Sequence, residues 1–274
     1  MKTIILSFIF ASMTLVNGEG DAVEQLDRED FKLSYVDELF INDAKLKVQM
    51  DVLDEKIHKN PVNAKLNDDG EIIPEKPGLR LDRNTFRQLF HEYFYTGKKM
   101  KTELPVEKVY PRVDSELIAE IREQKIGDYV TYFKPSNKER SHNIDLAAEA
   151  INNHVVFPGE TFSFNRVVGK RTKEKGYKRA PVIVKGELSE DIGGGICQVS
   201  STLYNAVDLK GIQITERYSH SRRVPYVPPG RDATVSWYGP DFEFKNNYKR
   251  PLLIRAFARN GKMLVSIYSS DALE

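Results

Sequence analysis

The feature that most constrains this chain is its single cysteine, which follows three consecutive glycines at the start of an apolar run. The stretch from Gly193 to Ala206 reads GGGICQVSSTLYNA, and its apolar residues recur at the three- and four-residue spacing of one helix face. This pattern predicts a helix that has Cys197 in its first turn and ends before Gly211. The unpaired backbone N–H groups and partial positive charge of a helix N-terminus stabilise a thiolate, so the position favours a reactive cysteine.

A cysteine nucleophile needs a base to take its proton and a third group to hold that base. The alternating residues after Gly211 predict a strand that brings His220 to a sheet edge, and Asp232 opens the next predicted strand. A helix-start cysteine, a strand histidine and a strand aspartate, in that order, resemble papain-like and transglutaminase-like folds. We therefore predict Cys197, His220 and Asp232 as candidate catalytic residues.

Each of these residues also has an ordinary structural interpretation. A lone cysteine is most often a small buried apolar side chain. His220 lies between two serines and can be a hydrogen-bonded structural histidine, and Asp232 follows Pro228-Pro229-Gly230, where turn residues are common. Three hypotheses therefore remain open. The first is a cysteine-dependent amidase, peptidase or transpeptidase, and the second is a binding module without turnover in which Cys197 is structural. The third is a redox-sensitive thiol that pairs with another protein.

The glycines and their neighbours are predicted to form the substrate-binding surface. Glycine lets a substrate backbone approach closely, and the N–H groups of a helix start can hold an oxyanion. The predicted substrate-binding residues are Gly193, Gly194, Gly195, Gln198, Ser200, Arg171 and Tyr177.

A basic cluster precedes the glycines, and it is either a solvated face or a surface for acidic groups such as peptide carboxylates. It consists of Arg166, Lys170, Arg171, Lys173, Lys175, Lys178 and Arg179.

No metal and no other cofactor is predicted. The histidines that could join Cys197 and His220 as ligands are His142 and His154. None of these residues stands in a C-x-x-C, H-x-H or H-E-x-x-H pairing, which are the spacings typical of zinc sites.

The periodicity along the chain predicts an α+β protein with two domains. In the first, residues 30–127, helical stretches alternate with short strands; its clearest helix begins after Asp82 and ends at Gly97. The second, residues 128–270, is predicted as helices followed by an antiparallel sheet. Its strongest local signal is Asn260-Gly261 between two alternating runs, which is typical of a hairpin.

Residues 1–18 resemble a secretory signal, with Lys2 before an apolar run and small residues before Glu19. The alternative is an uncleaved anchor, and contact with a membrane is expected only in that case. A single cysteine excludes an intramolecular disulfide. A formal net charge of +1 provides no attraction for a polyanion, so no nucleic-acid partner is expected.

Several sequence blocks in the second half together resemble the VanW family, which is named from vancomycin-resistance gene clusters. The resemblance covers about residues 128 to 260. Its blocks include Phe162-Ser163-Phe164-Asn165, Val168-Gly169-Lys170-Arg171-Thr172, the run from Gly193 to Ala206, His220-Ser221 and Asp232-Ala233. In the first half, the stretches around residues 61–65 and 74–78 resemble the YoaR-like peptidoglycan-binding domain that often precedes VanW.

This resemblance implies an exported bacterial protein that acts at the cell wall, with peptidoglycan or its stem peptides as partner. It implies no reaction, so the roles of Cys197, His220 and Asp232 rest on the residues themselves. One departure is Asp208, which stands near the helix end where an apolar residue is expected.

Overall fold

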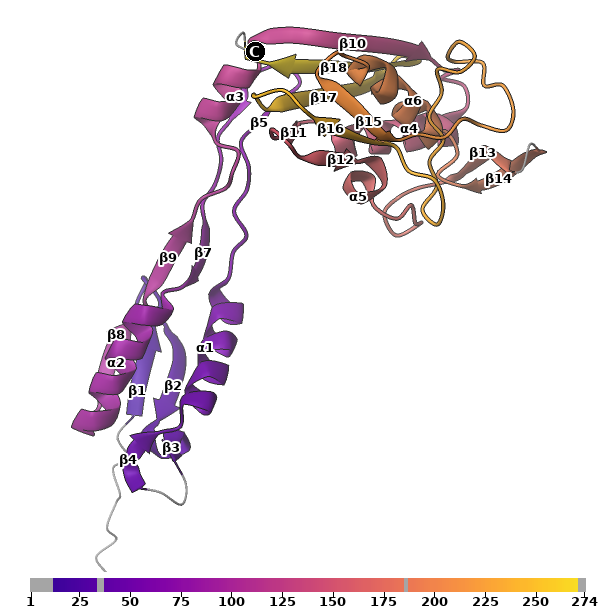
Figure 1. Cartoon of the computed structure of the whole chain (residues 1–274). Helices are drawn as coiled ribbons and strands as arrows, with labels where there is room; N and C mark the ends of the chain where they lie inside the picture. The colour runs from indigo at the N-terminus through magenta and orange to yellow at the C-terminus, as the bar shows by residue number, and fades with distance from the viewer. Residues whose placement is uncertain (1–11, 34–36, 185–186, 271–274) are drawn as a thin grey trace, which may run out of the picture. The chain divides into compact units, whose positions relative to one another are not determined.

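The computed structural model describes residues 12–33, 37–184 and 187–270, and its contacts divide the chain into two compact units (Figure 1). The first unit comprises the chain up to Asn63 and Glu75–Arg112, and the second comprises Ala64–Pro74 and the chain from Val113 onward. Both units combine helices with small, mostly antiparallel sheets, which confirms the predicted α+β class.

The first unit is built on a three-stranded sheet and two helices. The sheet has the order β2-β1-β8, formed by Ala22–Asp27, Ser12–Val16 and Met100–Glu103. The helices are α1 (Asp43–Ile57) and α2 (Arg83–Thr96). The smaller elements are η1 (Arg28–Phe31), the strand pair β3 (Lys32–Leu33) and β4 (Asp37–Ile41), and the strand pair β7 (Gly78–Leu81) and β9 (Val106–Val109).

Helix α2 confirms the clearest prediction for this half of the chain. The carboxylate of Asp82 accepts hydrogen bonds from the backbone N–H groups of Asn84 and Thr85, and Gly97 ends the helix with a φ of 60°. Its aromatic face is completely buried, because rings such as Phe90 fill the space between the helix and the sheet.

Strand β1 lies within the predicted signal segment, residues 1–18. Residues 1–11 lie outside the described residues, but Ser12–Val16 form the middle strand of the sheet, where Met13 and Leu15 are fully buried. Cleavage after Gly18 would remove this strand and expose the apolar faces packed against it. The predicted end of the signal segment therefore disagrees with the fold. No helix within the described ranges is long and apolar enough to cross a membrane.

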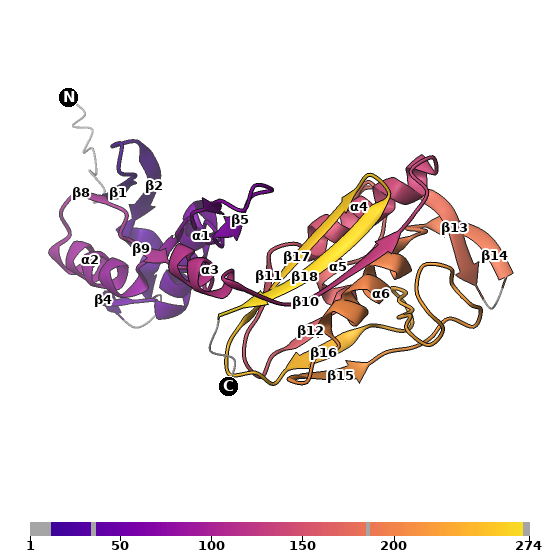
Figure 2. The same ribbon diagram turned by 90° about the horizontal axis from the view of Figure 1, so that it is seen from above.

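The second unit contains a four-stranded antiparallel sheet with helices packed against it (Figure 2). Its order is β10-β18-β17-β11, formed by Gln124–Tyr132, Lys262–Ser269, Leu252–Arg259 and His154–Val156. The turn between β17 and β18 is Asn260-Gly261, both with positive φ, as predicted.

The remaining elements of the second unit surround this sheet. The helices are α3 (Ser115–Ile121), α4 (Lys138–Ile151), α5 (Phe164–Val168) and α6 (Ile196–Val207). A second sheet has the order β12-β16-β15, formed by Thr161–Ser163, Glu243–Asn246 and Ile212–Glu216. Two hairpins complete the unit: β5 (Lys65–Leu66) with β6 (Ile72–Ile73), and β13 (Arg179–Val184) with β14 (Glu187–Ile192).

The division between the units differs from the predicted boundary at residues 127 and 128. The hairpin of β5 and β6 and helix α3 pack on the sheet face that carries Val155 and Leu253. Asn153 adds two hydrogen bonds to the backbone of Leu66, 2.9 Å to its N–H and 3.0 Å to its C=O. Sequence patterns did not reveal these contacts because each short hairpin strand carries too few apolar residues to show which core it joins.

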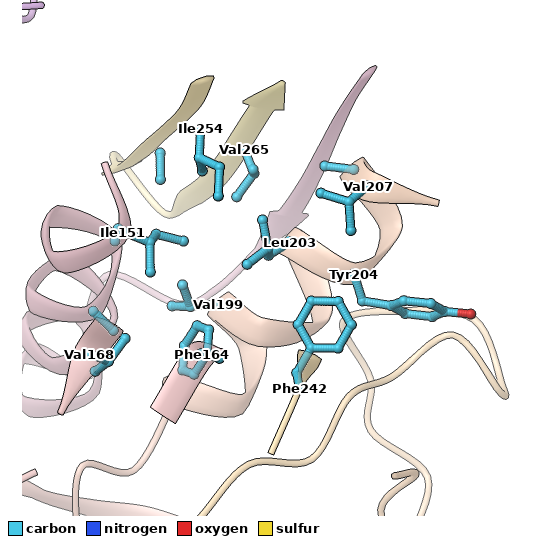
Figure 3. Packing of buried hydrophobic residues seen from close by; sticks show 14 of the residues in the cluster. Ile151, Phe164, Val168, Val199, Leu203, Tyr204, Val207, Phe242, Ile254 and Val265 are labelled. Carbon is cyan, nitrogen blue, oxygen red and sulfur yellow. The ribbon is translucent and has the colours of Figure 1, made fainter. Parts of the chain in front are cut away.

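Helix α6 lies in the largest core of the molecule (Figure 3). Alternate residues of β17 and β18, such as Ile254 and Val265, face α4 and α6 across one side of the sheet. Val199 and Leu203 of α6 are fully buried in this cluster. Since the whole helix is packed on its surroundings, its first turn is held in one position.

Candidate active site

Cys197 lies in the first turn of α6, as the sequence predicts. Gly195 precedes the helix with a φ of 109°, a backbone conformation that favours glycine, and no side chain caps the helix start. Within the described residues, the backbone N–H groups of Gly195 and Cys197 have no hydrogen-bond acceptor, whereas those of Gly193, Gly194 and Ile196 are bonded to backbone carbonyls. Two donors are therefore available beside the thiol.

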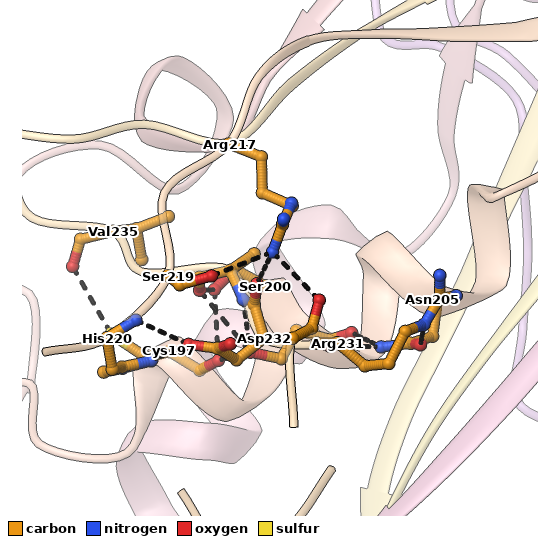
Figure 4. A network of polar contacts seen from close by, with 12 residues as sticks. Cys197, Ser200, Asn205, Arg217, Ser219, His220, Arg231, Asp232 and Val235 are labelled. Atoms are coloured by element: carbon orange, nitrogen blue, oxygen red, sulfur yellow. Dashed lines mark hydrogen bonds and ion pairs between the residues drawn. The ribbon is translucent and has the colours of Figure 1, made fainter. Parts of the chain in front are cut away.

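The structure brings the three predicted catalytic residues together (Figure 4). Nδ1 of His220 lies 2.6 Å from Oδ2 of Asp232, and the two side chains are 6% and 9% exposed. The His220 ring also interacts electrostatically with the Cys197 side chain, whose Sγ lies 3.4 Å from the Val235 carbonyl oxygen. Because Asp232 occupies Nδ1, Nε2 is the ring nitrogen that remains available to the sulfur.

The charges within this group favour a thiolate and an imidazolium. Burial disfavours the thiolate, but the hydrogen bond and charge of His220 outweigh it and lower the pKa of Cys197. Burial likewise opposes the charged ring, yet Cys197 and Asp232 raise the pKa of His220. The pKa of Asp232 is lowered: burial opposes its ionisation, but the His220 hydrogen bonds prevail. Cys197 remains partly exposed, as a nucleophile must be.

The chain around His220 and Asp232 is irregular, which corrects the prediction that each lies on a strand. Strand β15 ends at Glu216, and residues 217–236 contain no strand. Side chains of α6 replace the sheet as support: Ser200 Oγ donates to the Ala233 carbonyl at 2.6 Å, and Ser201 Oγ accepts from the Ala233 N–H at 2.9 Å. Ser200 is therefore fully buried in a structural contact, and its role in substrate binding stays a prediction.

The thiol opens into a cavity of about 680 Å³, which also contains His220 in its wall. The predicted residues Gly193, Gly195, Gln198 and Arg171 line it. Cavities of this size hold small ligands or short peptide segments.

Three predicted binding residues make structural contacts. Gly194 is buried and does not line the cavity; a Cβ atom there would lie 2.4 Å from the Ala180 carbonyl oxygen, so it is required for packing. Tyr177 is 5% exposed and belongs to the core. The side-chain amide of Gln198 is fully engaged: it donates to Thr131 Oγ1 and the Tyr132 carbonyl and accepts from Arg140.

The sequence analysis missed several residues that line the cavity. Arg140 comes from α4, and Tyr226 and Trp237 come from the irregular chain that flanks Asp232. No local pattern marks them, because Arg140 stands in an ordinary polar stretch and the aromatic residues have no periodic spacing. Only the packing of α4 beside α6 brings Arg140 to the cavity.

The predicted basic cluster is divided between two environments. Arg171 lines the cavity, and the exposed Lys170 lies over the Tyr238 ring at its rim, 5.2 Å from the centroid. Lys173, Lys175, Lys178 and Arg179 are exposed and line none of the cavity.

The other histidines lie apart from the thiol. Nε2 of His142 is 3.0 Å from the Gly176 carbonyl oxygen, and His154 packs edge-on against Phe162. In the described part of the chain, no three His, Cys, Asp or Glu side chains are grouped as metal ligands.

The fold and the site define an α+β protein with a cysteine–histidine–aspartate arrangement at the start of a buried helix. The chain belongs to the VanW-like family, and the family model, described as VanW like protein, matches residues 139–268, which include all three of these residues. This confirms the resemblance predicted from the sequence blocks.

Two relatives support the assignment. The chain is 55% identical over 258 residues to a Bacillus subtilis protein described as uncharacterized protein YoaR, covering 94% of this chain and 85% of the relative. It is 34% identical over 110 residues to the vancomycin B-type resistance protein VanW of Enterococcus faecalis, covering 38% of this chain and 40% of that protein. No solved structure matches the chain significantly.

Proposed function

We propose that this is an exported cell-wall protein that binds peptidoglycan and carries out thiol-dependent acyl transfer or amide hydrolysis on its stem peptides. The observation that supports the proposal is the position of His220, which is hydrogen-bonded to Asp232 and lines the same cavity as Cys197. The name of the Enterococcus faecalis relative, a vancomycin resistance protein, supports a site of action at the wall. Peptidoglycan or its stem peptides is the proposed partner, and an extracytoplasmic location is proposed with it.

In the proposed reaction the Cys197 thiolate attacks the carbonyl carbon of an amide. A carbon–sulfur bond forms, and the carbonyl electron pair moves onto oxygen, where the free N–H groups of Gly195 and Cys197 stabilise the charge. When the carbon–nitrogen bond breaks, the His220 imidazolium gives its proton to the leaving amine. The product of this half-reaction is a thioester on Cys197.

The second half-reaction releases the acyl group. Water or the amine of another peptide attacks the thioester carbon while His220 takes the proton of the nucleophile, and the thiolate of Cys197 leaves. Water completes a hydrolysis, and an amine completes a transpeptidation. Asp232 keeps Nδ1 of His220 protonated and so directs Nε2 at the reacting atoms.

The test is to incubate the protein with purified muropeptides and to follow the products and the mass of Cys197. The proposal expects new products, a transient mass increase on Cys197, and loss of both in Cys197→Ala. Circular dichroism and thermal melting of the variant control for folding. If wild type and Cys197→Ala give the same products, or neither gives any, the thiol reaction is refuted.

The alternative is a non-catalytic peptidoglycan-binding module in which Cys197 is structural. One contact favours it: Sγ of Cys197 donates a hydrogen bond to the Val235 carbonyl at 3.4 Å, a bond that also serves a packed thiol. Under this alternative, retention on purified cell-wall sacculi is equal for wild type and Cys197→Ala, and no substrate is turned over.

A further inference from the structure

Two guanidinium groups line the cavity that contains Cys197, and neither forms an ion pair with a carboxylate within the described residues. They belong to Arg140 of α4 and to Arg171, which follows α5. Asp191 lines the same cavity, but its Oδ1 accepts a hydrogen bond from the Ile192 N–H at 2.7 Å and pairs with neither arginine. The two guanidinium groups therefore line the cavity without a carboxylate of the described chain paired to either of them.

Arg171 has one satisfied and one unsatisfied nitrogen. Its NH1 donates to Oδ1 of Asn165 at 2.7 Å, whereas its NH2 is buried and has no partner. The aliphatic part of the side chain packs against Gly193, where a Cβ atom would lie 3.2 Å from that of Arg171. A buried guanidinium nitrogen without an acceptor is costly, which indicates that a ligand supplies the acceptor.

Arg140 is held on the other side of the glycine loop. Its NH2 donates to Gln198 Oε1 at 2.7 Å, and a Cβ atom at Gly195 would lie 2.8 Å from its NH1. Gln198 is itself fixed by two hydrogen bonds, so the guanidinium is preorganised. Burial lowers the pKa of Arg140 and of Arg171, and the negative charge of Cys197 raises both, so both arginines lie within electrostatic reach of the thiolate.

The Cys197 side chain is not the missing partner, because its Sγ donates a hydrogen bond to the Val235 carbonyl at 3.4 Å and is hydrogen-bonded to neither guanidinium. A guanidinium binds a carboxylate through parallel charge-assisted hydrogen bonds, and two guanidinium groups on either side of the loop before Cys197 suit one carboxylate close to the reacting carbonyl.

We propose that Arg140 and Arg171 bind a free carboxylate of the substrate and thereby select peptides that carry one beside the bond attacked by Cys197. The reactive step rests on the proposed function; the carboxylate site does not, because binding requires no thiol chemistry. The two arginines are specificity residues for an anionic peptide.

The test uses a reporter that the chain already contains. Trp237 is the only tryptophan of the sequence, lines the same cavity and is 41% exposed, so its fluorescence reports occupancy. Full-length Cys197→Ala is titrated with synthetic stem peptides of three, four and five residues, each as the free acid and with its carboxylates converted to amides. We expect at least one free acid to bind at least tenfold more tightly than its amide.

Substitutions test whether the two arginines cause the difference in affinity between free acid and amide. Each of the variants Arg171→Gln and Arg140→Gln should lower the affinity for the free acid at least tenfold and leave the affinity for the amide unchanged. The variant Arg171→Lys should recover part of the affinity for the free acid. Lys173→Gln is the matched control, since it removes a positive charge from an exposed residue that does not line the cavity and should change affinity less than about twofold.

The outcomes separate this site from the proposed reaction. Equal affinity for acid and amide, or no binding of any free acid, refutes the carboxylate site even where wild-type protein turns muropeptides over. Selective binding of the acid by a protein whose thiol never reacts supports the carboxylate site and refutes the enzyme.

Discussion

The Asp232 carboxylate accepts two hydrogen bonds from a single residue: Oδ2 lies 2.6 Å from Nδ1 of His220 and 2.6 Å from its backbone nitrogen. One bond orients the imidazole ring, and the other fixes the backbone that carries it. Because both residues lie in irregular chain, this double contact replaces the sheet that would normally position a base. The following predictions test the site and the fold that holds it.

The first prediction concerns the reactivity of the thiol. Since His220 lowers the pKa of Cys197, alkylation by iodoacetamide should reach half its maximal rate at a pH below the value of about 8.5 for a free cysteine. His220→Gln should move this midpoint to higher pH. The control is His142→Gln, whose ring contacts the Gly176 carbonyl and does not line the cavity. An unchanged midpoint in His220→Gln would show that the two side chains do not interact.

The second prediction is a pH window for the stabilising effect of Asp232. Its pKa is lowered in the fold, so its contribution is fully present above the unfolded value of about 3.9 and is lost as the pH falls through the folded value. The pKa of His220 is raised in the fold. The stabilising contribution of its imidazolium is therefore fully present below the unfolded pKa of about 6.5 and is lost as the pH rises through the folded pKa.

The difference in free energy of unfolding between wild type and Asp232→Asn should therefore be largest between about pH 4 and pH 6.5. It should shrink on both sides of that window. Urea denaturation at a series of pH values measures it, and a difference that is independent of pH would contradict the charged pair.

The third prediction concerns the loss of stability when glycine is replaced by alanine. It compares Gly194, where packing leaves no room for a side chain, with Gly159, where only the backbone conformation favours glycine. Gly194→Ala places a Cβ atom 2.4 Å from the Ala180 carbonyl oxygen, and backbone cannot move aside as a side-chain tip can. We expect a loss of about 3 kcal/mol in stability. In the matched variant Gly159→Ala the new methyl group meets no atom within 4 Å, and only the positive φ of 76° is strained, so about 1 kcal/mol is expected. Equal losses in the two variants would exclude a steric role for Gly194.

The fourth prediction tests whether the chain before Gly18 belongs to the fold. Leu15 is fully buried in β1, so Leu15→Ala should lower the free energy of unfolding of the first unit by about 3 kcal/mol. Val48→Ala on α1, where the side chain is 62% exposed, should change it by less than about 0.5 kcal/mol. A neutral Leu15→Ala, together with a mature N-terminus at Glu19 by mass spectrometry, would support cleavage after Gly18 instead.

The local features of the fold were predictable from the sequence because they depend on neighbouring residues. The helix start at Cys197, the Asp82 cap and the Asn260-Gly261 turn each follow from side chains a few positions apart. Strands β17 and β18 follow from period-two alternation. The predicted strand after Asp232 was wrong, because Ser200 and Ser201 of α6 bind this segment through hydrogen bonds that no alternation pattern encodes.

The sequence by itself determined which reactive groups this protein can use: one thiol at a glycine-led helix start, and a histidine and an aspartate downstream of it. The tertiary structure decided which residues share a cavity with that thiol. It directed Arg140 and Arg171 toward the cavity and assigned Ser200, Gly194 and Tyr177 to packing. The physical reason is that burial and charge pairing depend on distances between elements far apart in the chain, which no local pattern of residues contains.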